Sequence, residues 1–90
     1  MRIGNADDVE VAVLSGDADE IREAWFFYER VESLRAEKST IFLRQLAAKK
    51  LKVLEAALRI CPENGSLNFF GSKEKIEREI ELYRKESAHD

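Results

Sequence analysis

Residues that interrupt or cross-link a chain are scarce in this sequence. Its 90 residues include one proline, four glycines and one cysteine. Because so few prolines and glycines break the chain, long helices are favoured over many short strands. A lone cysteine excludes an internal disulfide, which agrees with a reducing compartment. We therefore expect an all-α protein of the cytoplasm.

The sequence also lacks long apolar runs and the residues of common cofactor sites. No run approaches the roughly 18 to 20 apolar residues of a membrane span, and residues 1–5 lack the apolar core of a secretory signal. The only histidine, His89, stands beside the C-terminus, and one histidine with one cysteine cannot make a structural zinc site. No Gly-rich phosphate loop occurs. We expect no membrane contact, no metal, no cofactor and no catalytic residues.

Charge is unevenly distributed within the single domain that a chain of this length can form, residues 1–90. Residues 1–38 carry a formal charge of −5, residues 39–61 carry +4, and residues 62–90 carry −2. The acidic total of −3 argues against a protein whose main work is to neutralise phosphates. Packing of oppositely charged segments beside each other is the simplest explanation of this pattern.

Two long segments have the apolar spacing of helices, about 17–37 and about 40–61. Asp17 and Glu20 have the spacing of a capping box, and Ser39 or Thr40 can cap the second helix. The short link between the segments predicts a long antiparallel hairpin. A third helix over about 73–87 begins after Ser72 and presents one narrow apolar stripe.

Two shorter segments are ambiguous. Residues 8–14 alternate valines with other residues like a strand, yet Asn5 as a cap and Ser15-Gly16 as a stop favour a short helix. Residues 67–70 form either a short extended stretch or an apolar plug on the open end of the hairpin. The predicted fold is thus a small helical bundle, built on the hairpin, with a short N-terminal helix, alternatively a strand.

Phe26 breaks the pattern of the first long helix because helical geometry places it on the polar face. Arg22 and Arg30 lie one turn before it and one turn after it. Aromatic residues flanked by arginine are typical of binding hot spots. The alternative is a single exposed aromatic with no role.

Lys50 breaks the pattern of the second long helix, since it lies in the centre of the apolar arc. A buried ammonium is costly unless it is paired. Its stem can lie along the core while the amine reaches water; alternatively, a partner chain covers it or an acid of the first helix pairs with it. Cys61 ends the same arc and is expected to be a small core residue.

A basic set on the second helix offers a different function. Its members are Arg44, Lys49, Lys52 and Arg59. With no aromatic side chain on that face to stack on a base, these residues are expected to solvate the helix or to pair with acids, and contact with nucleic acid is the alternative.

The sequence therefore predicts a non-catalytic protein that binds another protein through Phe26, Arg22, Arg30 and Lys50, and that forms a homodimer. Small acidic helical proteins of this kind include adaptors, assembly factors and stoichiometric inhibitors such as antitoxins and phage-type inhibitors of host systems. A nucleic-acid-associated regulator is the first alternative. A small helical enzyme is the second, and a polar cavity around Lys50 with two carboxylates would favour it.

Overall fold

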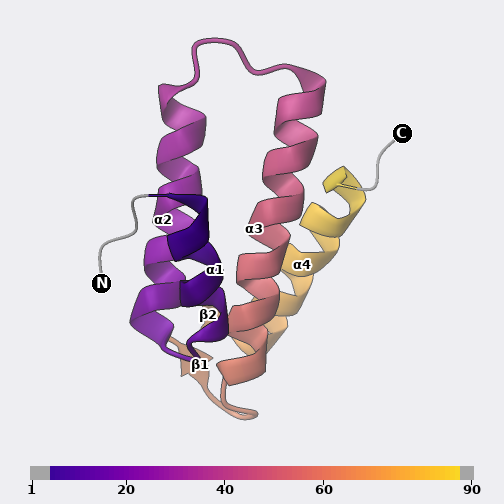
Figure 1. Cartoon of the computed structure of the whole chain (residues 1–90). Helices are drawn as coiled ribbons and strands as arrows, with labels where there is room; N and C mark the ends of the chain where they lie inside the picture. The colour runs from indigo at the N-terminus through magenta and orange to yellow at the C-terminus, as the bar shows by residue number, and fades with distance from the viewer. Residues whose placement is uncertain (1–4, 88–90) are drawn as a thin grey trace.

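The computed structural model describes residues 5–87. It contains four helices that alternate in direction, together with one pair of two-residue strands (Figure 1). The helices are α1 (Ala6–Leu14), α2 (Ala18–Leu34), α3 (Thr40–Ile60) and α4 (Lys73–Ser87), and β1 (Ser66–Leu67) pairs antiparallel with β2 (Gly71–Ser72) between α3 and α4. The predicted all-α bundle is confirmed.

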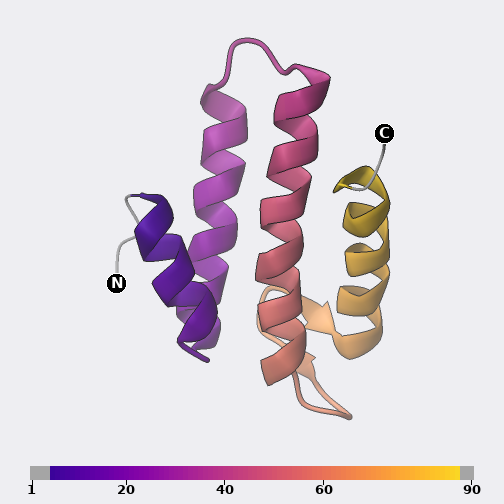
Figure 2. The same cartoon turned by 45° about the vertical axis from the view of Figure 1, so that its right-hand side comes forward.

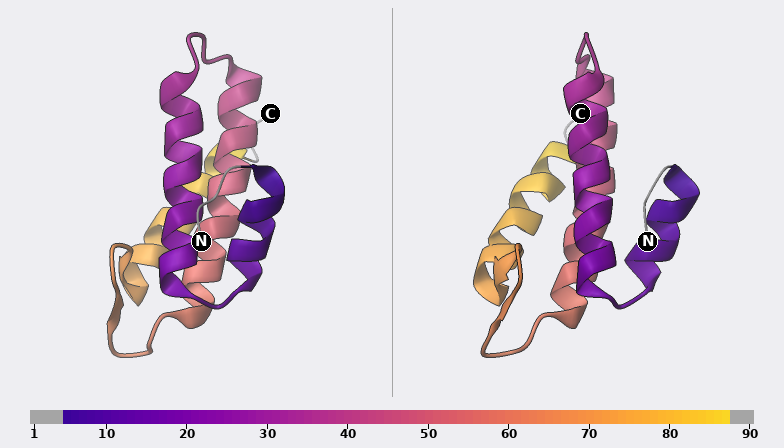
Figure 3. Two further views of the ribbon diagram at one scale, coloured as in Figure 1. Left: turned by 60° about the vertical axis from the view of Figure 1, so that its left-hand side comes forward. Right: turned by 90° about the vertical axis from the view of Figure 1, so that its left-hand side faces the viewer.

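The hairpin of α2 and α3 is the central unit. α3 packs on α2 along one side and on α4 along the other, as Figure 2 shows. Seen edge-on in the right panel of Figure 3, α1 and α4 lie on opposite sides of the hairpin. The molecule therefore has an α1 side and an α4 side.

The helix termini follow from capping side chains. Asn5, Asp17, Ser39 and Ser72 each accept hydrogen bonds from backbone N–H groups in the first turn of the following helix. The capping box at α2 is only half formed, because the hydroxyl of Ser15 accepts the hydrogen bond from the Asp17 N–H. With Asn5 capping a helix, the alternative of a strand at residues 8–14 is wrong.

The predicted boundaries need one correction. α2 ends at Leu34, three residues before the predicted end at residue 37. Arg35 adopts an extended conformation, its guanidinium lies 4.4 Å from the centre of the Phe42 ring, and its carbonyl accepts a hydrogen bond from Lys38. These contacts fix the link between α2 and α3, which consists of the five residues 35–39. α4 begins and ends as predicted.

The core follows the predicted apolar stripes. α3 contributes small residues that are fully covered, and Ala56 and Ala57 let neighbouring helices approach closely. The indole of Trp25 makes edge contacts with the rings of Phe70 and Tyr83, at centroid distances of 6.3 and 5.7 Å. Trp25 thereby joins α2 to α4 and to the loop between β1 and β2.

Residues 67–70 are a buried apolar plug rather than an extended stretch, since only Leu67 lies in a strand and residues 68–70 form a turn. Leu67 pairs with Gly71 across the two short strands, and Leu67 and Phe70 are both buried. Phe69 between them has a φ of +78° and points outward. Cys61 is buried as a free thiol, as predicted.

The turn between α1 and α2 generates a stability prediction. Gly16 has a φ of +73°, and a Cβ built on it meets no atom within 4 Å. Gly16→Ala should therefore cost about 1 kcal/mol of unfolding free energy through backbone strain alone. Gly16→Asn should cost less, because asparagine tolerates this conformation. Urea denaturation measures both; equal losses for the two variants would contradict this explanation.

Candidate functional site

Lys50 is buried, with 5% of its surface exposed, on the side of α3 that faces α2 and α4. Its Nζ lies 3.2 Å from Oε1 of Glu32 and 3.4 Å from Oε2 of Glu29, both on α2. Of the three possibilities left by the sequence, the structure selects the ion pair with acids of the first long helix. Lys50, which the sequence placed among the protein-binding residues, is paired within its own chain.

Aromatic rings complete the surroundings of this ammonium. The Trp25 indole lies with its ring centre 5.1 Å from Lys50 Nζ, and its Nε1–H donates to Glu29 Oε1 over 3.2 Å. Tyr83 of α4 stacks edge-on against the same indole. The ammonium is therefore held by two carboxylates and the face of one indole, a combination that offsets its desolvation.

The electrostatic balance at Lys50 favours its charged form. Burial acts to lower the pKa of Lys50, but the hydrogen bond to Glu32 and the negative groups around it outweigh burial, so the pKa is raised above 10.5. Burial also raises the pKa of Tyr83 above 10.0. Lys50 is thus an ammonium, and a nucleophilic lysine needs a lowered pKa instead.

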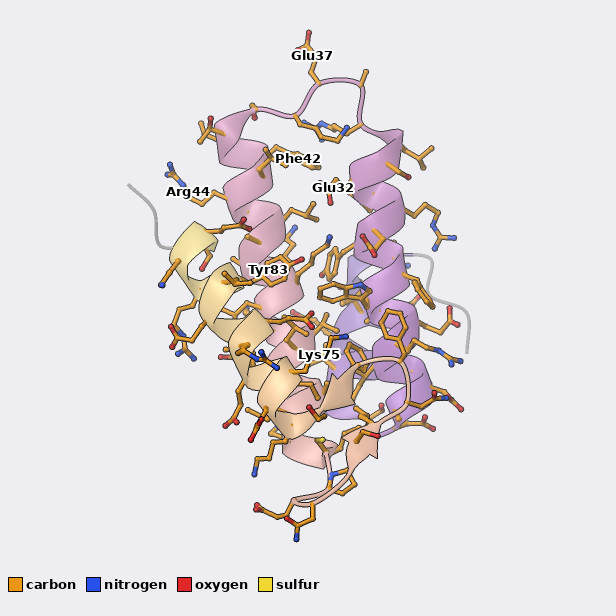
Figure 4. The ribbon with its side chains drawn as sticks, turned by 180° about the vertical axis from the view of Figure 1, so that it is seen from behind. Glu32, Glu37, Phe42, Arg44, Lys75 and Tyr83 are labelled. Atoms are coloured by element: carbon orange, nitrogen blue, oxygen red, sulfur yellow. The ribbon has the colours of Figure 1, made fainter. Side chains whose placement is uncertain are left out.

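A cavity of about 480 Å³ opens next to this ion pair on the α4 side. Its lining includes Lys50 with Glu32 of α2, Arg44 of α3, and Tyr83 and Glu86 of α4. Figure 4 shows Glu32, Arg44 and Tyr83 on this side, each coming from a different helix. The cavity has the two carboxylates that the sequence analysis set as a criterion for an enzyme.

Phe26 is 40% exposed and does not stand alone. Its ring packs against the ring of Phe69, which is 45% exposed, at a centroid distance of 4.9 Å and an interplanar angle of 63°. We call these two residues the aromatic pair. Phe69 was not predicted from the sequence; the signal that could have found it is the pair of successive phenylalanines before Gly71, because neighbouring side chains of a short segment seldom both face the core.

The arginines beside Phe26 differ in their contacts. Arg22 pairs with Asp19 over 3.5 Å, and its Nε is buried without a hydrogen-bond partner in the described part of the chain. Arg30 is exposed, and none of the ion pairs within residues 5–87 involves it. The face of α2 that carries Phe26 therefore offers one uncommitted positive charge.

The structure does not bring the basic set together. Arg44 lines the cavity on the α4 side, whereas Lys49 and Lys52 line a groove on the α1 side. Arg59 is exposed on the last turn of α3. Four basic residues divided in this way do not form one track for a phosphate backbone.

No family model, curated protein or solved structure matches this chain. Within residues 5–87, no three side chains of His, Cys, Asp or Glu are grouped to hold a metal ion. In the same range, no helix is long and apolar enough to cross a membrane. His89 lies outside the described residues. The aromatic pair and the Lys50 cavity are the features from which we infer function.

The burial of Lys50 predicts unequal effects of two substitutions. Lys50→Ala removes the ammonium and leaves a void, so it should lower the unfolding free energy by about 2 kcal/mol or more. Lys50→Met keeps the volume of the lysine stem. The side chains of Glu29 and Glu32, which lose their partner, are 51% and 34% exposed and can be hydrated instead. This substitution should therefore lower the unfolding free energy by only about 1 kcal/mol. Chemical denaturation compares them; equal costs would mean that stem packing contributes little.

The raised pKa values predict a loss of stability at alkaline pH. Between the unfolded pKa of Lys50 and its higher folded pKa, the folded state binds more protons than the unfolded state. Tyr83 acts in the same direction, because its folded pKa is also raised. Stability should therefore hold from pH 8 to about pH 10 and fall above it, and less steeply in Lys50→Met. Thermal unfolding from pH 8 to 12 tests this, and a flat profile would refute it.

Proposed function

We propose that this protein is a non-catalytic binding module that acts on another protein, as an adaptor, an assembly factor or a stoichiometric inhibitor. The aromatic pair is its anchor. The observation that carries the proposal is the contact of two exposed phenylalanine rings from segments far apart in the sequence, 4.9 Å between centroids. Aromatic residues, phenylalanine included, and arginine are enriched at the centres of protein–protein interfaces.

The backbone at Phe69 supports this proposal. A φ of +78° is a rare conformation for a bulky residue and costs on the order of 1 to 3 kcal/mol. The buried neighbours Leu67 and Phe70 and the two short strands hold it in place. Such strain contributes nothing to folding, and its effect is to present an aromatic ring at the surface beside Phe26.

Charge indicates the chemistry of the partner. Phe26 has arginines one turn away on both sides, and Arg30 has no ion pair within residues 5–87. The complementary surface is an apolar pocket bordered by carboxylates. A partner of this kind would cover both rings and neutralise Arg30.

The aromatic pair should matter for binding more than for folding. Phe26→Ala should cost about 1 kcal/mol of stability, and a double-mutant cycle with Phe69→Ala should give a coupling of about 0.5 to 1.5 kcal/mol. Phe70→Ala, in the core, should cost about 3 kcal/mol or more. If Phe26→Ala and Phe70→Ala lowered the denaturation midpoint equally, Phe26 would belong to the core.

Binding itself is tested with a matched control. The wild-type chain and the variants Phe26→Asp and Leu82→Asp are immobilised, and proteins of the native host that each retains are identified. Leu82 is an exposed apolar residue of α4 outside the aromatic pair. We expect a protein that wild type and Leu82→Asp retain and Phe26→Asp loses, with one-to-one binding in calorimetry weakened by about 2 kcal/mol or more in Phe26→Ala. If no protein distinguished Phe26→Asp from the control, the proposal would fail.

A second candidate function is binding or catalysis in the Lys50 cavity. Its support is the cavity lining, which combines Lys50 and Arg44 with the carboxylates of Glu32 and Glu86. The cavity volume of about 480 Å³ suits a small ligand. The raised pKa of Lys50 suits its ammonium to electrostatic stabilisation of a bound anion rather than to nucleophilic attack. Screening small zwitterionic compounds by the fluorescence of Trp25 tests this candidate, with Arg44→Ala as the control.

A further inference from the structure

α1 is apolar on two sides. Val9 and Ala12 are buried against the hairpin, whereas Val11 and Leu14 point away from it with 54% and 81% of their surface exposed. Neighbouring apolar side chains that stay exposed on a helix are typical of a surface that a partner covers. The hairpin covers only one side of α1, so an apolar surface remains without a partner on the α1 side of the molecule.

Next to this surface lies a groove between α1 and α3. Glu10 and Leu14 form its α1 wall, Tyr28 of α2 forms its floor, and Lys49 and Lys52 form its α3 wall, around a volume of about 420 Å³. Tyr28 and Lys49 also line a second hollow of about 240 Å³ nearer the hairpin tip. The two hollows are neighbours, since both are lined by Tyr28 and Lys49.

The two walls carry opposite charge. Glu10 is the acid on the α1 wall, while Lys49 and Lys52 are exposed on α3. None of the ion pairs within residues 5–87 joins Glu10 to either lysine. Both charged walls are therefore available to a partner that brings the opposite sign to each.

We propose that the occupant of this groove is a second copy of the chain, in a two-fold dimer in which α1 of each protomer lies against α3 of its partner. A second copy brings an acidic helix with exposed apolar residues for the lysine wall, and at the same time a lysine wall for the acidic helix. This reciprocity is the signature of an isologous interface. A standard interface covers about 800 Å² of each partner, roughly an eighth of the 6031 Å² surface of this chain.

This groove differs from the binding residues that the sequence predicted, which include Phe26 and Lys50. Lys50 is satisfied within its own chain, so it gives no reason for association. The groove also lies on the α1 side of the hairpin, whereas the aromatic pair includes a ring from the β1–β2 loop on the α4 side (Figure 3). The dimer therefore stands independently of the proposed function.

Sedimentation equilibrium of the full chain at tens of micromolar is the first test. We expect a species of twice the 10.4 kDa monomer mass. Leu14→Ser should raise the dimer Kd at least tenfold, and its 81% exposure means that the fold survives, as circular dichroism can verify. Leu82→Ser on α4 and Phe26→Ala should leave the Kd within twofold. A wild-type chain that is monomeric, or a dimer lost with Phe26→Ala and kept with Leu14→Ser, would overturn the proposal.

A charge exchange tests the contact between protomers directly. One variant carries Lys49→Glu with Lys52→Glu, and the other carries Glu10→Lys. Each alone places like charges together twice per dimer and should raise the Kd at least tenfold. Mixed in equal amounts, they restore opposite charges at both contacts, so the heterodimer should form at the wild-type concentration. Folded variants that stay monomeric in the mixture would refute the proposed interface, and would favour a different acidic helical protein as the occupant.

Discussion

The ion pair of Lys50 constrains the rest of the structure. An ammonium with 5% of its surface exposed is tolerated only where α2 places Glu29 and Glu32 within reach of it. These two acids are three residues apart on one face of α2, so the pair fixes the register of α2 against α3. The same contact brings the Trp25 indole over the ammonium, and Tyr83 of α4 packs on that indole. The position of three helices is thus tied to one charged group.

The local structure was predictable because it depends on neighbours in the sequence. The caps Asn5, Asp17, Ser39 and Ser72 lie within three residues of the N–H groups they satisfy, so their pattern located every helix start. The end of α2 was placed three residues too late, because the contact of Arg35 with Phe42 joins the link to α3 and leaves no pattern within α2 itself.

The candidate site was predictable only in part, because some of its contacts join residues that are far apart in the sequence. Phe26 was identified from the face of its own helix, but its neighbour Phe69 comes from a loop whose path depends on the burial of Leu67 and Phe70. Helical spacing placed the basic set on one face of α3, but it does not predict which other helix packs beside each of these residues. α4 lies next to Arg44 and α1 lies next to Lys49, and this arrangement separates the two.

The order in which the elements pack has a consequence for how the chain folds. α1 contacts α2, α2 contacts α3, and α3 contacts α4, so most contacts join elements that are adjacent along the chain. Chains with such local topology reach the native state in microseconds to milliseconds. Because α4 packs chiefly on α3, the hairpin can form during synthesis before the 15 residues of α4 have been made. The edge contact between Trp25 and Tyr83 then joins the last helix to the first long one and completes the bundle.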